Sequence, residues 1–561
     1  MSKEWQKFYD EGVPLHLEYP EKTIYEFFEE AVTASPNRPA TFFFGKKTTY
    51  GQLGKQVDQF ASALASLGVS TGARVALILP NLPGYAVAHF AAMKLGAILV
   101  PTNPLYVERE LELQLNDSGV EIVVCLDRLH LRLNAIISNT SVKHVVYMGV
   151  QDFLPFPLKV GYLIKNRGQA PVEPGENIYF YSDLLKKCFP VLHTHPTNPD
   201  DVAVLLYTGG TTGISKGAVL THRNLVSNVL QTGRWMGVSG EPREIILSVL
   251  PFFHSYGMTT SLHLGILSRA TLVLLPRFDL PDVVKRIKKH RPTIFCGVPS
   301  MYNSVTRFPG IVPEDINSIR LCVSGGAALP EDVQIRFEKM TGGRLVEGYG
   351  LSETSPVAIV NPLYGKRKVG SIGIPISDTE ARIVDPDTRT ELEVGEVGEL
   401  ALRGPQIMRE YWNMPEETDQ VFADGWLLTG DLATQDEDGF VSIVDRAKDI
   451  IISAGMNIYP REIEEVLMTH PSILEVAVLG VPSRVREEVV KSFIVLLEDA
   501  ELSKMDVVEF CIGKLAKHKI PKQIEFRSEL PKSSIGKILK RVLVDEEREK
   551  ADARSRGRNP S

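Results

Sequence analysis

The sequence predicts an α/β protein, and three patterns along the chain support this prediction. In the N-terminal part, apolar runs of strand length alternate with amphipathic stretches, which is typical of a mostly parallel sheet with helices on both faces. From Lys368 to Val444, glycine-rich turns separate short alternating runs, which indicates an antiparallel β region. From Asp449 onward the elements are shorter, and we expect a small separate α/β domain there.

The N-terminal elements follow one another in a regular order. Apolar residues at helical spacing in TIYEFFEEAV predict a helix that contains Ile24 and Phe28. The apolar run 73–81 predicts a buried strand, and the run 84–96 predicts a helix that ends at a glycine. The same alternation of strands and helices is predicted for 97–126, with a helix over 108–116, and again for 201–276 and 293–323.

The C-terminal elements are predicted from shorter runs. EARIVD, GELALRG and GFVSIVD are typical of strands in the antiparallel region. Beyond it, ILEVAVLGV, VKSFIVLL and QIEFRS predict further strands, and REIEEVLMTH and the residues near 507–517 predict helices.

The composition excludes several classes of protein. The 561 residues include 62 Lys and Arg against 69 Asp and Glu, a formal charge of −7. This balance gives no electrostatic reason to expect nucleic-acid binding. The five cysteines are far apart and lack a CxxC spacing, which argues against a disulfide framework and against a zinc site.

The N-terminus and the hydropathy pattern indicate a cytoplasmic protein. MSKEWQKFYDEG lacks the apolar segment of a secretory signal. The longest apolar stretch, 85–100, is interrupted by His89 and Lys94 and is shorter than a membrane-spanning helix requires. The sequence leaves open peripheral contact with the inner face of the membrane and the formation of a homodimer.

The most informative segment is VLLYTGGTTGISKGAVLTH, residues 204–222. An apolar run ends at Tyr207, and TGGTTG follows before Lys216. Glycines let backbone N–H groups approach an anion, threonine hydroxyls add donors, and the lysine adds positive charge. The segment predicts a polyphosphate site, with a flexible surface turn as the alternative. It is neither a Walker A loop nor a dinucleotide fingerprint, because GxxxxGK[ST] and GxGxxG are absent.

Three further segments carry chemistry-bearing residues. In GRLVEGYGLSETSP, Ser352 and Glu353 follow a glycine–tyrosine–glycine turn, and a hydroxyl beside a carboxylate is a pair of oxygen ligands that Mg²⁺ on a nucleotide prefers. The second segment is residues 425–464, and the third is LPKSSIGKILKR, where Lys537 precedes a basic helix. Each of these segments taken alone could also be a turn or a solvated face.

In this order and at these separations, the four segments resemble the adenylate-forming family of acyl-CoA synthetases, luciferases and peptide-synthetase adenylation domains. The resemblance spans residues 23–541 and is strongest to bacterial long-chain fatty-acid–CoA ligases. It implies a large N-terminal domain of two doubly wound lobes plus a β subdomain, over residues 1–447. It also implies a small mobile α/β C-terminal domain over 448–561, with the hinge at Lys448.

The resemblance implies roles for individual residues. Lys537, Glu353 and Thr208 are implied to be catalytic, and Glu353 and Thr208 are also implied to hold Mg²⁺. Asp431 is implied to accept the ribose hydroxyls, with Arg446 beside the same sugar. The nucleotide-binding residues that the resemblance implies are Thr208, Gly209, Gly210, Thr211, Thr212, Gly213, Lys216, Gly325, Gly326, Ala327, Glu347, Gly348, Tyr349, Gly350, Ser352, Asp431, Ile443, Arg446, Gly455 and Lys537.

The activity implied is ATP- and Mg²⁺-dependent activation of a fatty acid to acyl-AMP, followed by transfer to coenzyme A. A medium- to long-chain acid is favoured by Gly209, since this glycine form of the loop is similar to that of the long-chain ligases. The alternatives are the same chemistry on an aryl or short branched acid, adenylation with transfer to a carrier-protein thiol, and a non-catalytic nucleotide-binding regulator.

Two features concern the acid and its delivery. PFFHSYGM resembles the family's acyl-pocket segment and places His254 near the substrate carboxylate, although a packed core histidine is the alternative. Residues 152–169, DFLPFPLKVGYLIKNRGQ, resemble an insertion of the long-chain ligases. Their mixture of apolar and basic residues suits a membrane surface, and a loop folded over the N-terminal domain is the alternative.

Overall fold

The chain forms two compact units of unequal size. The computed structural model describes residues 4–168, 170–187, 197–208, 215–238, 243–446, 448–453, 456–482, 488–498, 500–533 and 536–556. Unit 1 comprises residues 1–380 and 402–427, and unit 2 comprises residues 381–401 and 428–561. The predicted α/β class is confirmed, while the domain boundary between 447 and 448 stays a prediction.

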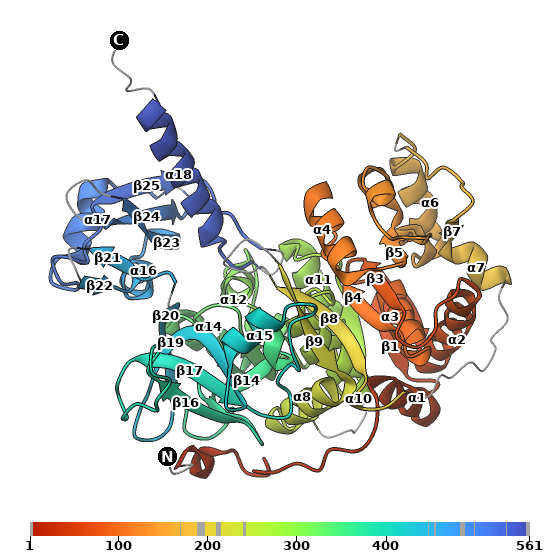
Figure 1. Cartoon of the computed structure of the whole chain (residues 1–561), viewed down its shortest axis with the longest axis horizontal. Coiled ribbons are helices and arrows are strands. Elements are labelled where there is room, and N and C mark those ends of the chain that lie inside the picture. The colour runs from red at the N-terminus through yellow and green to blue at the C-terminus, as the bar shows by residue number, and fades with distance from the viewer. Residues whose placement is uncertain are drawn as a thin grey trace. The chain divides into compact units, whose positions relative to one another are not determined.

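A seven-stranded sheet forms one part of unit 1 (Figure 1). All neighbouring strands are parallel except the β8–β9 pair, which is an antiparallel hairpin. In sheet order the strands are β7 (Ile178–Phe180), β6 (His144–Met148), β5 (Ile122–Leu126), β3 (Arg74–Ile78), β4 (Ile98–Pro101), β8 (Val202–Thr208) and β9 (Lys216–Thr221).

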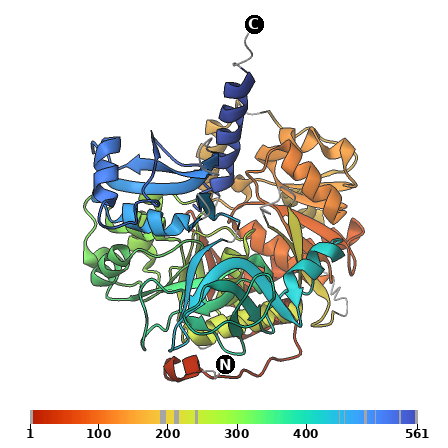
Figure 2. The same ribbon diagram turned by 60° about the vertical axis from the view of Figure 1, so that its left-hand side comes forward.

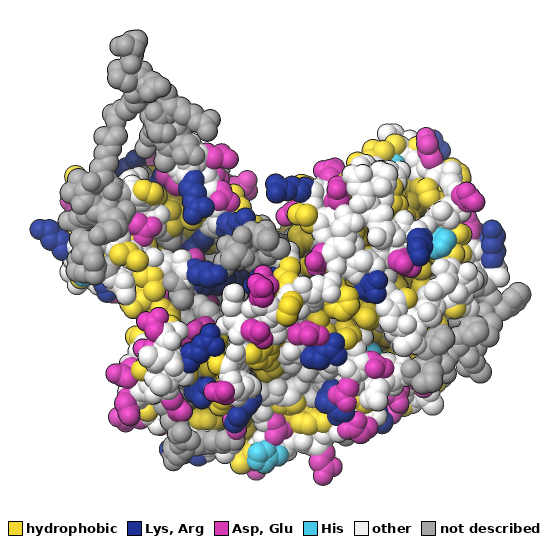
Figure 3. Space-filling view, viewed as in Figure 1, with side chains coloured by type: hydrophobic (Ala, Val, Ile, Leu, Met, Phe, Trp, Pro, Cys, Tyr) yellow, Lys and Arg dark blue, Asp and Glu magenta, His cyan; other side chains and the backbone are white. Residues whose placement is uncertain are grey.

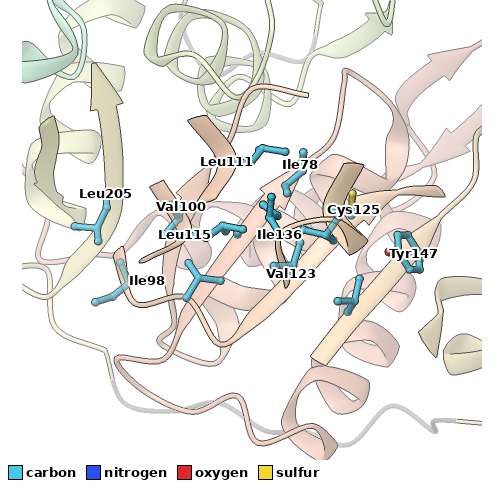
Figure 4. Packing of buried hydrophobic residues seen from close by; sticks show 14 of the residues in the cluster. Ile78, Ile98, Val100, Leu111, Leu115, Val123, Cys125, Ile136, Tyr147 and Leu205 are labelled. Carbon is cyan, nitrogen blue, oxygen red and sulfur yellow. The ribbon is translucent and has the colours of Figure 1, made fainter. Parts of the chain in front are cut away.

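Helices cover both faces of this sheet, as predicted. On one face, Leu111 and Leu115 of α4 pack against Ala76, Ile78 and the same-side residues of the neighbouring strands (Figure 4). On the other face lies α3, whose side chains are all buried, as its lack of a polar stripe requires. The helices of this part are α1 (Ile24–Ala34), α2 (Tyr50–Ser66), α3 (Pro83–Lys94), α4 (Glu108–Ser118), α5 (His130–Asn134), α6 (Phe156–Lys165), α7 (Tyr181–Lys187) and α8 (His222–Trp235).

Two four-stranded sheets of unit 1 are joined through Ile294, which bridges Ile246 on one side and Leu321 on the other. The first has the order β10 (Ile245–Ser248), β11 (Thr271–Leu274), β1 (Pro39–Phe43), β2 (Lys46–Thr49), and the second has the order β12 (Leu321–Ser324), β13 (Arg344–Gly350), β14 (Val357–Val360), β15 (Ile374–Pro375). Their helices are α9 (Ser255–Gly257), the π-helical turn η5 (Met258–His263), α10 (Leu264–Leu267), α11 (Leu280–His290), α12 (Pro299–Thr306), α13 (Pro313–Ile316), α14 (Glu331–Thr341) and the 3-10 turn η6 (Ser352–Thr354).

The glycine-rich region forms a five-stranded sheet. Its order is β16 (Glu380–Val384), β17 (Gly398–Arg403), β19 (Trp426–Gln435), β18 (Phe422–Ala423), with β20 (Val441–Arg446) also paired to β19. The pairings of β19 with β18 and with β20 are antiparallel, in agreement with the sequence prediction. Helix α15 (Pro415–Val421) precedes β18.

The C-terminal part of unit 2 contains a two-stranded sheet, β21 (Ile451–Ser453) and β22 (Met456–Ile458), and a three-stranded sheet, β23 (Ile473–Pro482), β24 (Glu488–Leu496) and β25 (Gln523–Arg527). Its helices are α16 (Pro460–Met468), α17 (Lys504–Cys511) and α18 (Lys540–Arg556). Both ribbon views show α18 beside the three-stranded sheet and projecting past it (Figure 1, Figure 2).

The boundaries of two helices differ from the prediction. Helix α4 continues two residues beyond Asn116, to Ser118, and Gly119 caps it with a left-handed φ of 61°. Helix α17 begins earlier than expected, where the Ser503 hydroxyl caps it, and ends at Cys511. The chain turns there because Gly513 has a φ of 82°, a conformation that glycine adopts without steric cost.

Two further expectations concern the cysteines and membrane-spanning helices. The four cysteines among the described residues, Cys125, Cys296, Cys322 and Cys511, are buried and free, and Cys188 lies outside those residues. Over the same described ranges, no helix is both long and apolar enough to cross a membrane.

A buried asparagine ties the seven-stranded sheet to the neighbouring sheet. Asn81 follows β3, and its amide nitrogen donates to the carbonyl oxygens of Ser248 (3.1 Å) and Leu250 (2.8 Å). Its side-chain oxygen accepts from the Phe252 backbone N–H at 2.8 Å. Only 1% of Asn81 is exposed, so these three bonds satisfy backbone groups that water does not reach.

Replacing Asn81 with alanine should therefore destabilise unit 1. The change leaves buried donors and acceptors without partners, and we expect a loss of about 3 kcal/mol in the free energy of unfolding. Chemical denaturation followed by circular dichroism measures this loss. Asn116→Ala is the matched control, because Asn116 is exposed on α4 and should change the same quantity by less than about 0.5 kcal/mol. Equal losses in the two variants would contradict the assigned role.

Candidate active site

The predicted phosphate loop connects β8 to β9. At its base, Thr208 pairs with Lys216 across the hairpin, and the Thr208 hydroxyl donates to the Lys216 carbonyl oxygen at 3.4 Å. The Ser215 hydroxyl donates to the Thr208 carbonyl oxygen at 2.7 Å. The hairpin thus places both ends of the loop side by side. The loop residues Gly209, Gly210, Thr211, Thr212 and Gly213 lie outside the described residues.

Two groups of residues predicted to bind the nucleotide lie at the carboxyl ends of two adjacent parallel strands. Gly325, Gly326 and Ala327 follow β12, and the predicted residues Glu347, Gly348, Tyr349 and Gly350 belong to β13, which pairs with β12 in parallel. Ligands of α/β proteins bind at such carboxyl ends. The structure therefore brings these two predicted groups together, and their contact with a nucleotide stays a prediction.

Close packing explains why glycines occupy three of these positions. A Cβ on Gly325 would lie 3.1 Å from the Tyr256 ring, and a Cβ on Gly348 would lie 2.8 Å from Val323. A Cβ on Gly350 would collide with the Pro356 carbonyl oxygen. Beside them, the buried Glu347 carboxylate accepts a hydrogen bond from the Leu329 backbone N–H at 3.1 Å, which orders the turn after β12.

Glu353 is held by a segment that sequence reasoning missed. Its backbone carbonyl accepts from the Met408 N–H at 2.7 Å, and its carboxylate accepts from the Tyr411 hydroxyl at 2.7 Å. Residues 408–412 form a strap, so named here, which also pairs with β9 through backbone bonds from Arg409 to Val219 (3.0 Å) and from Val219 to Glu410 (2.9 Å). Glu353 and Ser352, which opens η6, thereby lie against the phosphate-loop hairpin, since η6 contacts β8 and β9.

The strap also contacts the predicted phosphate-binding lysine. The Lys216 ammonium lies 5.1 Å from the centre of the Tyr411 ring, a cation–π distance. Burial, followed by the charge of Glu353 and the hydrogen bond to it, raises the pKa of Tyr411, so this hydroxyl stays a donor. Trp412 donates from its indole nitrogen to the Asp117 carbonyl oxygen at 3.2 Å. The sequence signal for the strap was two adjacent aromatic residues in a polar loop.

In unit 2 the two predicted ribose-binding residues face each other across a ladder. Asp431 of β19 pairs with Arg446 of β20, and the Arg446 Nε lies 3.3 Å from an Asp431 carboxylate oxygen. Only 7% of the Asp431 side chain is exposed. Ile443 lies on the same strand as Arg446, opposite Ala433. The antiparallel pairing therefore places on neighbouring strands three predicted residues that all lie within the segment 425–464.

Lys537 lies within electrostatic reach of this pair. It follows Gly536, whose φ is 83°, and its backbone N–H donates to the Ser533 hydroxyl at 3.1 Å. Desolvation, followed by the positive charge of Arg446, lowers the pKa of Lys537 to about 8, although the side chain keeps contact with solvent. An anionic ligand would favour the charged form.

Three predicted residues remain, His254, Lys448 and Gly455. His254 is half-buried, and its Nδ1 accepts from the Tyr256 backbone N–H at 3.2 Å, which caps α9. This contact gives His254 a local structural role, and its contact with a substrate stays a prediction. Lys448 is exposed. Gly455 lies outside the described residues.

The residues present suit Mg²⁺ that is bound together with a nucleotide. Among the residues that the structure describes, no group of three or more His, Cys, Asp and Glu side chains could hold a metal ion. Mg²⁺ on a nucleotide is usually bound through one or two carboxylates together with phosphates and water. One carboxylate, Glu353, beside the Thr208 hairpin suits that mode and does not suit a metal held by protein ligands alone.

Two protein-family models match the chain. The AMP-binding enzyme family matches residues 28–412, and the AMP-binding enzyme C-terminal domain matches residues 462–537. The long-chain-fatty-acid–CoA ligase of Bacillus subtilis (strain 168) is 42% identical over 98% of each chain. The feruloyl-CoA synthase of an Amycolatopsis species is 33% identical over 90% of this chain and 95% of its own length.

Solved structures agree with these sequence matches. The anthranilate CoA ligase AuaEII, in complex with anthranoyl-AMP, is 27% identical, with a TM-score of 0.84 over 96% of this chain and 99% of that structure. The first family model alone covers more than half of the chain, and the B. subtilis relative is aligned over nearly its full length. The chain therefore belongs to the family of AMP-binding enzymes.

Proposed function

We propose that the chain is a long-chain-fatty-acid–CoA ligase. It uses ATP to convert a fatty acid to acyl-AMP with release of pyrophosphate, and it then transfers the acyl group to CoA. The observation that supports this proposal best is the 42% identity to a long-chain ligase over nearly the whole of both chains. The chain also carries the charged residues that the chemistry needs, Lys216, Glu353, Asp431, Arg446 and Lys537, which argues against a non-catalytic regulator.

The first half-reaction makes the acid reactive. A carboxylate is a poor acyl donor, because its leaving group would be oxide. When a carboxylate oxygen attacks the α-phosphorus of ATP, the new O–P bond replaces the bond to the β-phosphate, and pyrophosphate leaves. Negative charge spreads over the phosphate oxygens in this transition state, so positive groups lower its energy. Lys216 supplies one such charge beside the phosphate loop, and Lys537 supplies another.

We further propose that Glu353 and the Thr208 hydroxyl hold Mg²⁺. When bound, the ion neutralises charge on the phosphates. Tyr411 fixes one carboxylate oxygen of Glu353 at 2.7 Å and orients the other. Tyr411 is thus a positioning residue, since it acts through Glu353.

The second half-reaction needs room for a thiol. The sulfur of CoA attacks the acyl carbonyl, the bond to AMP breaks, and a thioester forms. Lys537 has no part in this step and would occupy the space of the incoming thiol. A domain of residues 448–561 that turns about Lys448 would remove Lys537 after adenylation, and such movements commonly separate the steps of an enzyme.

The second candidate function is the same chemistry on an aryl acid. The feruloyl-CoA synthase and the anthranilate CoA ligase support it. The lower identities of these two proteins, 33% and 27% against 42%, favour the long-chain acid. Peripheral membrane contact and homodimer formation stay proposals as well.

A panel of acids tests the substrate. We expect kcat/KM for thioester formation to rise with chain length and to be at least about 100-fold higher for hexadecanoate than for butanoate or ferulate, because each buried methylene contributes about 0.8 kcal/mol. Coupled detection of AMP measures the rate with and without CoA. A maximum at ferulate would overturn the long-chain assignment, and AMP release that CoA does not stimulate would overturn CoA as the acyl acceptor.

Lys537→Ala should separate the two half-reactions. Loss of one preorganised donor should slow acyl-AMP synthesis from acid and ATP by about 10²–10³. The same variant, supplied with synthetic acyl-AMP and CoA, should form thioester at close to the wild-type rate. Pyrophosphate release and thioester absorbance measure the two steps independently.

Lys517→Ala provides the control for this experiment, because Lys517 is an exposed lysine of unit 2 outside the predicted site. It should leave both half-reactions within about twofold. Loss of both half-reactions in Lys537→Ala would refute the proposed domain movement, and loss of neither would show that Lys537 is only a surface residue.

A further inference from the structure

Helix α6 presents apolar residues to solvent and two of its polar residues, Lys159 and Tyr162, to the protein. Phe156 is 80% exposed, and Ile164 is 55% exposed, whereas Lys159 and Tyr162 are partly buried against the rest of unit 1. The exposed apolar residues of the helix are Phe156, Leu158, Val160, Leu163 and Ile164. In the space-filling view, hydrophobic side chains gather on the surface in the area where Figure 1 places α6 (Figure 3). This arrangement is the reverse of a helix that packs on its own core.

The segment before the helix is anchored to unit 1 and is not part of the exposed apolar face. Phe153 is 4% exposed, its ring lies 5.4 Å from the Tyr181 ring between centroids at a tilt of 38°, and it closely approaches Gly84 of α3. Leu154 is also buried. The helix that follows is therefore held at a fixed place on unit 1 by residues that do not belong to its exposed face.

A pocket of about 220 Å³ lies beneath α6. Two lysines line it, Lys159 of α6 and Lys46 of β2, together with one acidic residue, Asp152. Desolvation and the nearby charge of Lys159 lower the pKa of Lys46, so an anion between the two ammonium groups would be stabilised. The other lining residues are Phe43, Thr48, Gln56, Pro83, Phe153, Tyr181, Ser182 and Leu185.

Two buried polar atoms of the pocket residues have no hydrogen-bond partner in the described structure. They are the Tyr181 hydroxyl and the Gln56 side-chain oxygen, and Tyr181 is only 3% exposed. Buried polar groups without partners are uncommon in native proteins, and a bound ion or ligand is one explanation for them. The tyrosine can donate to an anionic oxygen, and the glutamine oxygen can accept from a hydroxyl of the same ligand.

The pocket and the apolar face lie next to each other on α6. Lys159 is three residues after Phe156 and four before Leu163, so these side chains are neighbours on the helix surface. No Asp or Glu occurs from 153 to 172, while Lys165 and Arg167 are exposed. A ligand with an anionic group in the pocket would therefore place an attached apolar part along α6, beside further positive charge.

We propose that this pocket binds the phosphate of an anionic phospholipid headgroup, and that α6 lies in the headgroup region of the bilayer. The exposed apolar residues of α6 lie on the outer surface and do not line the pocket, which favours a lipid surface over a single enclosed fatty acid. The basic residues complement anionic lipids. This inference does not depend on which acid the enzyme activates, because none of its residues belongs to the candidate active site.

Vesicle binding by the full chain tests the proposal. Cosedimentation is measured with vesicles of phosphatidylcholine alone and of phosphatidylcholine mixed with phosphatidylglycerol. Wild-type protein should prefer the mixed vesicles. The double variant Lys46→Ala/Lys159→Ala should bind them roughly 30-fold more weakly, while the variant with arginine at both positions should retain most of the binding. Activity on a soluble short acid should be unchanged in both variants, which checks that they are folded.

The matched control removes two positive charges from outside the pocket. Lys47→Ala/Lys55→Ala replaces two exposed lysines of β2 and α2 that do not line the pocket, and it should weaken binding less than threefold. An equal loss in this control would overturn the pocket in favour of general electrostatic attraction. Phe156→Ser/Ile164→Ser should reduce binding to both kinds of vesicle, and unchanged binding would overturn the contact through α6.

Two competitors distinguish the source of the anion. Glycerol 3-phosphate and decanoate are each added to wild-type protein with mixed vesicles. Neither should displace the protein at millimolar concentration if the pocket and the helix bind one lipid surface together. Displacement by glycerol 3-phosphate that requires Lys46 and Lys159 would identify a site for free phosphate esters, and equivalent displacement by decanoate would identify a loading site for fatty acid. Either result would overturn the lipid assignment.

Discussion

The position of Glu353 depends on the strap, which lies 58 residues further along the chain at Tyr411. The strap holds this residue at two points, through a backbone bond from Met408 and a side-chain bond from Tyr411, each of 2.7 Å. Because the same strap pairs with β9, the carboxylate and the phosphate-loop hairpin have a common support. A charge-assisted hydrogen bond of this kind contributes about 1.5–3 kcal/mol, enough to select one orientation of a carboxylate.

The sheets of unit 1 position the other residues of the candidate site. Parallel strands β12 and β13 end at the same edge, so the glycines after β12 and the residues of β13 lie together without any local sequence signal. The bonds of Asn81 connect the end of β3 with the backbone from Ser248 to Phe252. The segment that leads to His254 is thus fixed to the seven-stranded sheet. Backbone groups buried at these strand ends set the positions of side chains that are themselves only partly buried.

Much of the fold could be predicted because the apolar pattern of each element has a clear period. The buried helix α3 and the strands β3, β4 and β5 occur where that pattern placed them. Lys216, Glu353 and Lys537 were found from ordered motifs. Tyr411 could not be found in this way, because it meets Glu353 only through the pairing of the strap with β9.

The hydrophobicity of a residue also did not predict by itself whether that residue is buried. Phe153 and Phe156 are identical residues three positions apart, yet the first is buried and the second is 80% exposed. The difference comes from the approach of Phe153 to Gly84, where the missing side chain leaves space for its ring. Similarly, the end of α17 depends on the left-handed backbone of Gly513, which a helical pattern does not reveal.

A double-mutant cycle between Tyr411 and Glu353 tests most directly whether the strap acts through the carboxylate. Acyl-AMP synthesis is measured by pyrophosphate release for wild type, Tyr411→Phe, Glu353→Gln and the double variant, with the thermal unfolding midpoint of each as the check on folding. We expect Tyr411→Phe to lower the rate about tenfold and Glu353→Gln about 100-fold or more. The double variant should then be no slower than Glu353→Gln, because a positioning residue has nothing left to position. Losses that multiply would show that the two residues act independently and would contradict this account.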